Sequence, residues 1–247
     1  MTALILALVA GTVVGLALGG LGGGGSVLAV PALTYLIGMP AADAITASLI
    51  IVTVTSVTSL AQHARDGNVA WRTGLLFASA GIVPAMLTGL AAGRLPQALL
   101  TLAFAGIAGV AALRMLRGPA APAAGEVRPA KAGAAGAGLG AVTGLLGVGG
   151  GFLAVPALVR VLNLPMRRAV GTSLLVITIN SIAALGARAG TGMHLDWAVI
   201  APFTAAAILG AWDGKRYAQR LSGTTLQRLF AGVLLAVAAF MLVDALV

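Results

Sequence analysis

The sequence predicts an all-α polytopic membrane protein with two inverted-topology repeats, each a broken or re-entrant helix pair followed by three transmembrane helices. Three observations support this prediction. Hydrophobic residues make up 60% of the 247 residues and charged residues only 9%, whereas a soluble domain carries about 25% charged residues. A glycine-rich motif with a following proline occurs twice, and the basic residues gather in alternate loops. Lipid is therefore the predicted solvent for most of the chain.

The repeat is visible as an ungapped alignment of two short segments. Residues 22–33 (GGGGSVLAVPAL) align with residues 147–158 (GVGGGFLAVPAL), so that Pro31 matches Pro156 at a spacing of 125 residues. With one more residue of offset, Trp71 matches Trp197. The shared order of glycines, prolines and tryptophans predicts a duplicated unit. The predicted organisation is a first repeat over 1–116, a cytoplasmic linker over 117–132 and a second repeat over 133–247.

The predicted helices follow in chain order. Residues 1–37 are expected to enter the membrane and turn back as two broken helices or a re-entrant hairpin. Residues 133–163 are expected to do the same from the opposite side, because helix of this length extends about 46 Å and two crossings need about 60 Å. Apolar runs of membrane length cover 44–62, 71–92 and 97–114 in the first repeat and 169–188, 197–213 and 226–246 in the second. Three full crossings per repeat would insert the second copy upside down.

The basic residues support this arrangement. If the linker is cytoplasmic, thirteen of the fifteen Lys and Arg residues fall in cytoplasmic segments, and only Arg94 and Arg188 fall in outer ones. This distribution follows the positive-inside rule and predicts a multi-pass protein of the cytoplasmic (inner) membrane. The net charge of +9 is then loop charge, and no nucleic-acid partner is expected because the basic residues form no patch interleaved with aromatic residues.

Each glycine cluster is expected to turn the chain within the bilayer. Irregular backbone at this depth is tolerated only where it is buried in protein or lines a cavity. The short helix after each turn presents backbone N–H groups and the positive end of its dipole, an arrangement that binds anions. The candidate binding residues are Gly23, Gly24, Gly25 and Ser26 in the first repeat and Gly149, Gly150, Gly151 and Phe152 in the second.

Two further roles for these glycines compete with anion binding. Gly20, Gly22 and Gly25 match the GxGxxG pattern, but the segment lacks the polar surroundings and alternating strands and helices of a dinucleotide site. Close helix packing alone is the second competing role. The shortness of the segments and the fixed distance to Pro31 and Pro156 favour the anion site over packing alone.

Hydroxyl and amide side chains supplement the turns. Ser48, Thr172, Ser173 and Asn180 are candidate donors to the anion, although about half of such hydroxyls in a helix bond only a preceding carbonyl. No charged residue or His occupies the centre of a predicted span, and His63 is expected to lie at an interface. Neutral donors suit an anion better than Na⁺ or an amine. Without a nucleophile–base pair or a metal-ligand cluster, neither an enzyme activity nor a cofactor is expected.

The segment at 147–158, followed by Ala169-Val170-Gly171-Thr172-Ser173-Leu174, resembles the TauE/SafE sulfite exporter family. The first copy repeats the theme with residues 22–25, Val30-Pro31 and Ala44 to Leu49, and the resemblance covers almost the whole chain. It implies transport of small sulfur-containing anions across the cytoplasmic membrane. The first copy departs from the pattern at Thr46-Ala47-Ser48, where the second has Gly171-Thr172-Ser173, so the two halves are expected to contribute unequally if this stretch touches substrate.

The predicted function is secondary transport, with export of a sulfur-containing oxyanion or organosulfonate such as sulfite by alternating access. The alternatives are a transporter or channel for another small organic or inorganic anion and a non-transporting membrane scaffold subunit. The expected partners are the small anionic substrate and the lipid bilayer. The sequence is compatible with a homo-oligomer and leaves the coupling ion open.

Overall fold

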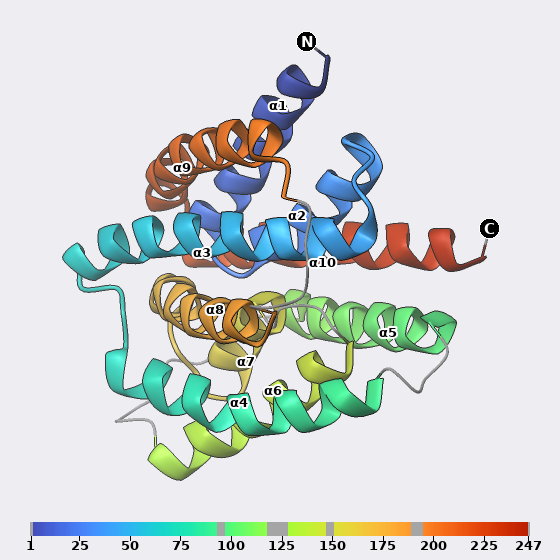
Figure 1. Ribbon diagram of the computed structural model, residues 1–247. Coiled ribbons are helices and arrows are strands. Elements are labelled where there is room, and N and C mark those ends of the chain that lie inside the picture. Colours follow the sequence, from blue (N-terminus) through green and yellow to red (C-terminus); the bar gives the residue numbers. More distant parts are fainter. Residues whose placement is uncertain (1, 93–96, 118–127, 147–150, 189–194, 247) are drawn as a thin grey trace.

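The computed structural model describes residues 2–92, 97–117, 128–146, 151–188 and 195–246, and these residues contain helices and no strand (Figure 1). The elements are α1 (Thr2–Leu21), α2 (Gly24–Pro31), the π-helix η1 (Ala32–Leu36), α3 (Ala41–Arg65), α4 (Trp71–Ala92), α5 (Gln97–Leu116), α6 (Pro129–Leu146), α7 (Gly151–Arg160), α8 (Met166–Arg188), α9 (Trp197–Arg220) and α10 (Gly223–Leu246).

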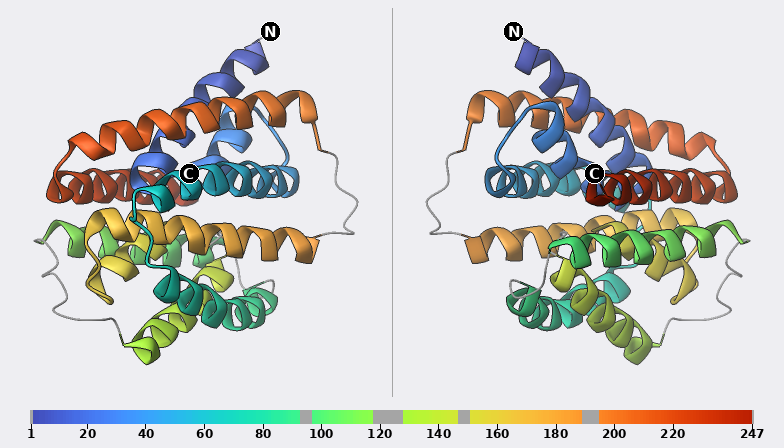
Figure 2. Two further views of the ribbon diagram at one scale, coloured as in Figure 1. Left: turned by 90° about the vertical axis from the view of Figure 1, so that its left-hand side faces the viewer. Right: turned by 90° about the vertical axis from the view of Figure 1, so that its right-hand side faces the viewer.

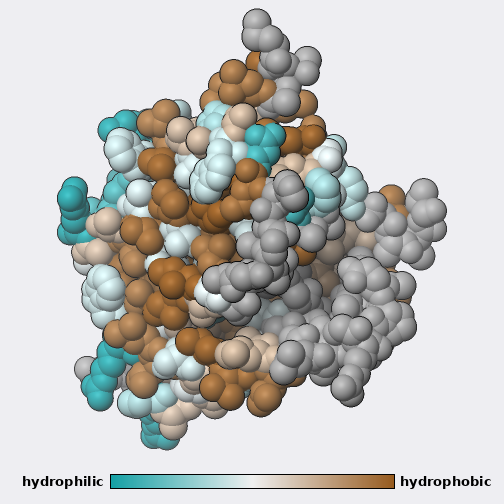
Figure 3. Space-filling view, in the orientation of Figure 1, coloured by the Kyte–Doolittle hydropathy of each residue, from teal (hydrophilic) through white to brown (hydrophobic). Residues whose placement is uncertain are grey.

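The predicted all-α polytopic membrane fold is confirmed. In the described part of the chain, five helices are long and apolar enough to cross a membrane: Leu4–Leu21, Asp43–Arg65, Met166–Gly186, Trp197–Arg220 and Gly223–Val243. Large apolar side chains such as Val9, Val83 and Leu209 are exposed on the outer surfaces of their helices. Figure 3 shows hydrophobic residues over most of the visible face and hydrophilic residues mainly toward its margins. Such a surface is suited to lipid.

The opening segment of each repeat is an unequal helix pair. α1 has 20 residues and α2 only 8, and at 1.5 Å per residue α1 alone extends about 30 Å, enough to cross a bilayer. The chain reverses after Leu21 at Gly22, whose φ of +68° suits glycine. Pro31 ends α2 and is followed by the π-helical turn η1, because proline lacks the N–H that the α-helical ladder needs. The second pair consists of α6 with 18 residues and α7 with 10.

The start of α6 differs from the predicted boundary. The helix begins at Pro129, inside the segment 117–132 that the composition indicated as linker. Proline is favoured in the first turn of a helix, where its missing N–H costs no hydrogen bond. The last residues of the predicted linker are therefore the first residues of α6, and residues 118–127 lie outside the described residues.

In each main helix pair, one helix comes from the first repeat and the other from the second. α1 lies along α9 and α6 lies along α4, while α3 packs on α8 and α5 on α10 (Figure 2). Gly11 and Gly15 lie against the backbone of Phe203 and Ala207, and Gly136 and Gly140 lie against the backbone of Phe77 and Gly81. These are equivalent positions at the offsets of the sequence alignment, so matching residues make matching contacts. The inverted insertion of the two repeats in a membrane stays a prediction.

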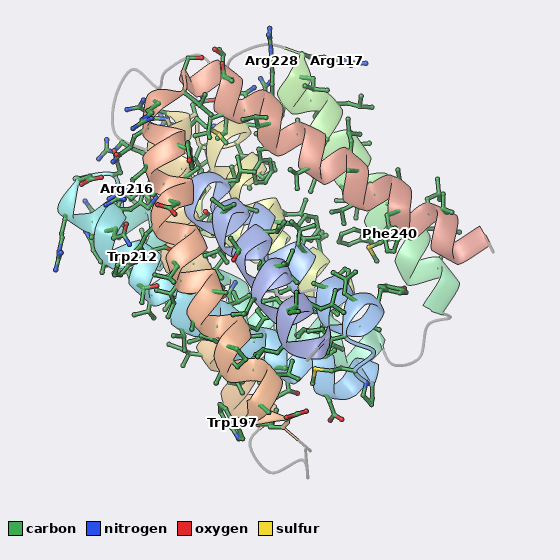
Figure 4. All side chains as sticks on the ribbon, turned by 90° about the horizontal axis from the view of Figure 1, so that it is seen from above. Arg117, Trp197, Trp212, Arg216, Arg228 and Phe240 are labelled. Atoms are coloured by element: carbon green, nitrogen blue, oxygen red, sulfur yellow. The ribbon has the colours of Figure 1, made fainter. Side chains whose placement is uncertain are left out.

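Charged residues distinguish the two ends of the bundle. Arg117, Arg216 and Arg228 lie toward one end and Trp197 lies at the opposite end (Figure 4). We call the first of these the basic end; by the positive-inside rule it is the predicted cytoplasmic end.

Candidate anion site at the glycine turns

The starts of α2 and α7 meet inside the protein. A Cβ atom added to Gly23 would overlap the carbonyl group of Gly151, and one added to Gly151 would press on Ser26 Oγ and on the Ile177 side chain. Ser26 and Gly151 are equivalent positions of the two repeats, 125 residues apart. The two short helices therefore begin at one shared point, and only glycine allows their backbones to approach so closely.

The first glycine turn also contacts α8. A Cβ atom on Gly22 would overlap Ser173 Oγ and lie 3.1 Å from the carbonyl oxygen of Val170. Ser173 is fully buried, and its hydroxyl donates to that same Val170 oxygen at 2.7 Å. Thr172 Oγ1 accepts a hydrogen bond from the Ala70 N–H at 3.0 Å, which ties α8 to the loop between α3 and α4. The structure thus brings Ser173 to the turn, whereas the Thr172 hydroxyl is directed to the loop between α3 and α4.

The other predicted binding residues have different surroundings. Gly24 begins α2 and Gly25 packs on Leu18. Ser48 is buried in α3 and donates to the Ile45 carbonyl at 2.7 Å. Gly149 and Gly150 lie outside the described residues, as does Gly147, the position equivalent to Gly22.

Phe152 and Asn180 lie farther from the shared point. The Phe152 ring packs on Phe104 with 4.8 Å between ring centroids, so the ring belongs to the apolar core and only the backbone of Phe152 is close to the turn. Asn180 is half-buried and follows one helical turn after Ile177, the α8 residue that contacts Gly151. Neither side chain is among the nearest neighbours of Gly22, Gly23 or Gly151.

The donors at the turn are engaged within the protein. The Gly22 N–H donates to the Leu18 carbonyl at 2.8 Å and the Gly25 N–H donates to the Gly22 carbonyl at 3.2 Å. The Ser26 hydroxyl donates to the Gly23 carbonyl at 2.8 Å. These three hydrogen bonds lie within the first turn, and it is the backbone contact of Gly23 with the Gly151 carbonyl that closes the shared point. An anion could reach this point only after the starts of α2 and α7 separate. Close packing accounts for Gly11, Gly15 and Gly19, each of which contacts the backbone of α9.

A polar cluster that sequence reasoning missed lies next to the first turn. Lys215 Nζ in α9 lies 2.7 Å from Asp66 Oδ2 and donates to the Gln62 carbonyl at 2.8 Å. Gln219 Nε2 donates to the same Asp66 oxygen at 2.8 Å. The His63 ring lies 3.3 Å from the Gly19 carbonyl and is buried among protein residues; its position at the membrane interface stays a prediction. The sequence shows charged residues after the predicted spans 44–62 and 197–213. It does not show that Asp66 from the first group pairs with Lys215 from the second.

Two hollows differ in the ligand chemistry that they suit. A cavity of about 20 Å³ is lined by Gly20, His63, Asn68, Arg167, Val170, Lys215, Ala218, Gln219 and Leu226; it has room for about one water molecule. A groove of about 480 Å³ lies between α5, α6 and α7, with a mostly apolar wall that includes Pro156. The groove suits hydrocarbon, whereas the small cavity has Arg167 and Lys215 in its lining. No cluster of His, Cys, Asp or Glu with metal-ligand geometry occurs among the described residues.

Comparisons with known proteins agree with this architecture. The family model of the sulfite exporter TauE/SafE matches residues 7–241. A probable membrane transporter protein of Xylella fastidiosa strain 9a5c is 36% identical over 97% of this chain and 95% of its own length. A probable membrane transporter protein of Methanocaldococcus jannaschii is 30% identical over 73% of this chain and 70% of its own length. No solved structure matches the chain.

Proposed function

The chain belongs to the sulfite exporter TauE/SafE family and is a membrane transporter, and we propose that it exports a small sulfur-containing oxyanion or organosulfonate, such as sulfite, by alternating access. The observation that carries this proposal is the meeting of the starts of α2 and α7. Ser26 and Gly151, equivalent residues of the two repeats, contact each other at the starts of two short helices.

The chemistry of this point favours an anion. The α2 and α7 helices start there, and each start is the positive end of a helix dipole. Ser26 and Ser173 add hydroxyl groups, and the contacts described around Gly22, Gly23 and Gly151 include no carboxylate. An oxyanion therefore finds donors without a repelling charge.

The closed packing supports alternating access over a permanent channel. Gly23 lies against the Gly151 carbonyl, and Gly22 lies against Ser173, so the backbone contacts leave no room for an ion at the shared point. A transporter needs such a closed state between its two open ones. In this mechanism the starts of α2 and α7 separate, the anion binds between them at the positive ends of the two helix dipoles, and it leaves toward the other side.

The test is uptake of radiolabelled sulfite by proteoliposomes that contain the purified protein, against protein-free liposomes. Ser173→Ala should raise the half-saturating sulfite concentration by about 3- to 30-fold, the loss that one neutral or charge-assisted hydrogen bond implies. Ser79→Ala is the matched control, because Ser79 also donates to the carbonyl three residues earlier, in α4, but is exposed and away from the turns.

Saturable uptake by the wild-type protein would distinguish a transporter from a channel. If the folded wild-type protein transports neither sulfite nor organosulfonates, the proposed substrate class is wrong. Transport of a different anion or a scaffold role would then remain. Equal kinetics of Ser173→Ala and Ser79→Ala would remove Ser173 from the anion site.

A further inference from the structure

The Asp66 carboxylate lies where the donors of the basic end converge. Lys215 and Gln219, one helical turn apart on α9, both donate to Asp66 Oδ2, at 2.7 Å and 2.8 Å. The Lys215 side chain is only 12% exposed, whereas Asp66 is 35% exposed. The Lys215 ammonium group is therefore held inside the protein, and the Asp66 carboxylate contacts it from the surface.

The cavity beside this pair has a positive wall. Lys215 and Arg167 line it, and no Asp or Glu does. His63 also lines it, is 6% exposed, and its Nδ1 has no hydrogen-bond partner among the described residues. The His63 Nε2–H donates to the Gly19 carbonyl, so Nδ1 of the neutral ring is an acceptor. The cationic donors of this wall are therefore Lys215 and Arg167.

The cavity lies directly beside the first glycine turn. Gly20, two residues before the turn, forms part of its wall, and the His63 ring lies 3.3 Å from the carbonyl of Gly19. Gly19 packs on Ala211, one helical turn before Lys215 in α9. The cluster therefore stands between the turn and the basic end, on the path that an anion from the predicted cytoplasmic side would take.

We propose that Lys215 and Gln219 form a second anion site at the basic end and that Asp66 is a built-in competitor for it. This inference rests on the proposed anion transport. A small oxyanion presents the same acceptor oxygens as the carboxylate of Asp66. Asp66 Oδ2 takes up the hydrogen bonds of both Lys215 and Gln219, and the cavity beside them holds only about 20 Å³. Binding of the anion to these donors therefore requires the carboxylate to leave.

The loop that carries Asp66 connects the ion pair to α8. It bends at Gly67, which has a φ of +69° and open space around it. The same loop places the Asn68 carbonyl against Gly171 and donates the Ala70 N–H to Thr172. Displacement of Asp66 therefore acts on the α8 segment whose next residue, Ser173, closes the first glycine turn.

The test compares Asp66→Asn with Lys215→Gln. A competitor and a binding residue give opposite effects: the half-saturating sulfite concentration should fall about 3- to 10-fold in Asp66→Asn and rise about 10-fold or more in Lys215→Gln. Lys215→Arg keeps the charge, so its half-saturating sulfite concentration should stay near the wild-type value. That result would show that the position tolerates a change of side-chain shape.

The matched controls are Asp213 and Arg216, which lie two residues before and one residue after Lys215 on α9. Asp213 and Arg216 form an exposed pair at 3.6 Å, so Asp213→Asn and Arg216→Gln make the same charge changes without touching the cavity. Both should leave the half-saturating concentration unchanged, because exposed charges are screened by salt.

Two readouts separate this inference from the transport proposal. Transport is measured in proteoliposomes, and binding is measured as the sulfite concentration that half-maximally protects the purified protein against thermal unfolding. If Asp66→Asn and Lys215→Gln both weaken binding, or both leave it unchanged, Asp66 is only a structural ion-pair partner and the inference is wrong. Opposite shifts in binding would uphold the second site even if the wild-type protein moved no sulfite, a result that would refute only the transport proposal.

Discussion

Gly15→Ala should destabilise the protein because the α1–α9 contact has no room for a methyl group. A Cβ atom at Gly15 would lie 2.7 Å from both the carbonyl carbon and the Cα of Ala207, whereas carbon atoms pack at about 3.5–4.0 Å. The two helices must therefore separate by about 1 Å. Overpacking of this kind costs about 1–3 kcal/mol, which for a chain of this size lowers Tm by roughly 2–12 °C.

Thermal unfolding of the purified protein in detergent, followed by tryptophan fluorescence, measures this effect. Gly232→Ala is the control, because Gly232 in α10 has nothing within 4 Å of the added Cβ and alanine is the better helix former. Gly140→Ala, the equivalent of Gly15 in the second repeat, should show the same loss because it meets the backbone of Gly81. A Tm for Gly15→Ala equal to that of Gly232→Ala would refute the close parallel packing of α1 and α9.

Two further predictions concern the ends of the helices. Asp196→Ala should cost about 1 kcal/mol, because Asp196 Oδ1 caps α9 by accepting the Ala198 N–H at 3.0 Å; an unchanged Tm would show that this cap does not stabilise the helix. The chain contains no cysteine, so Ala198→Cys and Thr224→Cys each introduce a single thiol, the first at the start of α9 and the second beyond its opposite end, at the start of α10. A membrane-impermeant maleimide should label Ala198→Cys in intact cells and Thr224→Cys only after permeabilisation; the reverse pattern would invert the predicted orientation.

The local pattern of the sequence located the helices well. The apolar run 71–92 has the same bounds as α4, and the run 97–114 ends two residues before α5 does. The run 197–213 stops where charges begin, whereas α9 continues to Arg220. Counting apolar residues measures the part of a helix that faces lipid, and a helix can extend beyond it into water with charged side chains. Element type was therefore predictable, but the end of a helix outside the apolar layer was not.

The candidate site could be predicted only in part. The glycine turns and Ser173 follow from the duplicated motif, because glycine permits a turn and a close approach wherever it stands. The contact of Ser26 with Gly151 and the engagement of the Gly22 and Gly25 N–H groups required the structure. Hydrogen bonds between segments depend on how the helices cross, and composition does not carry that information.

Hydropathy and charge determined the class of this protein and its helices, because both are properties of contiguous residues in contact with lipid or water, and the order of glycines, prolines and tryptophans revealed the duplicated motif. The tertiary structure alone decided that the starts of α2 and α7 share one point and that Gln219 reaches Asp66 across 153 residues of chain. Small residues on α1, α4, α6 and α9 let the backbones pack closely, and this packing sets which polar groups meet.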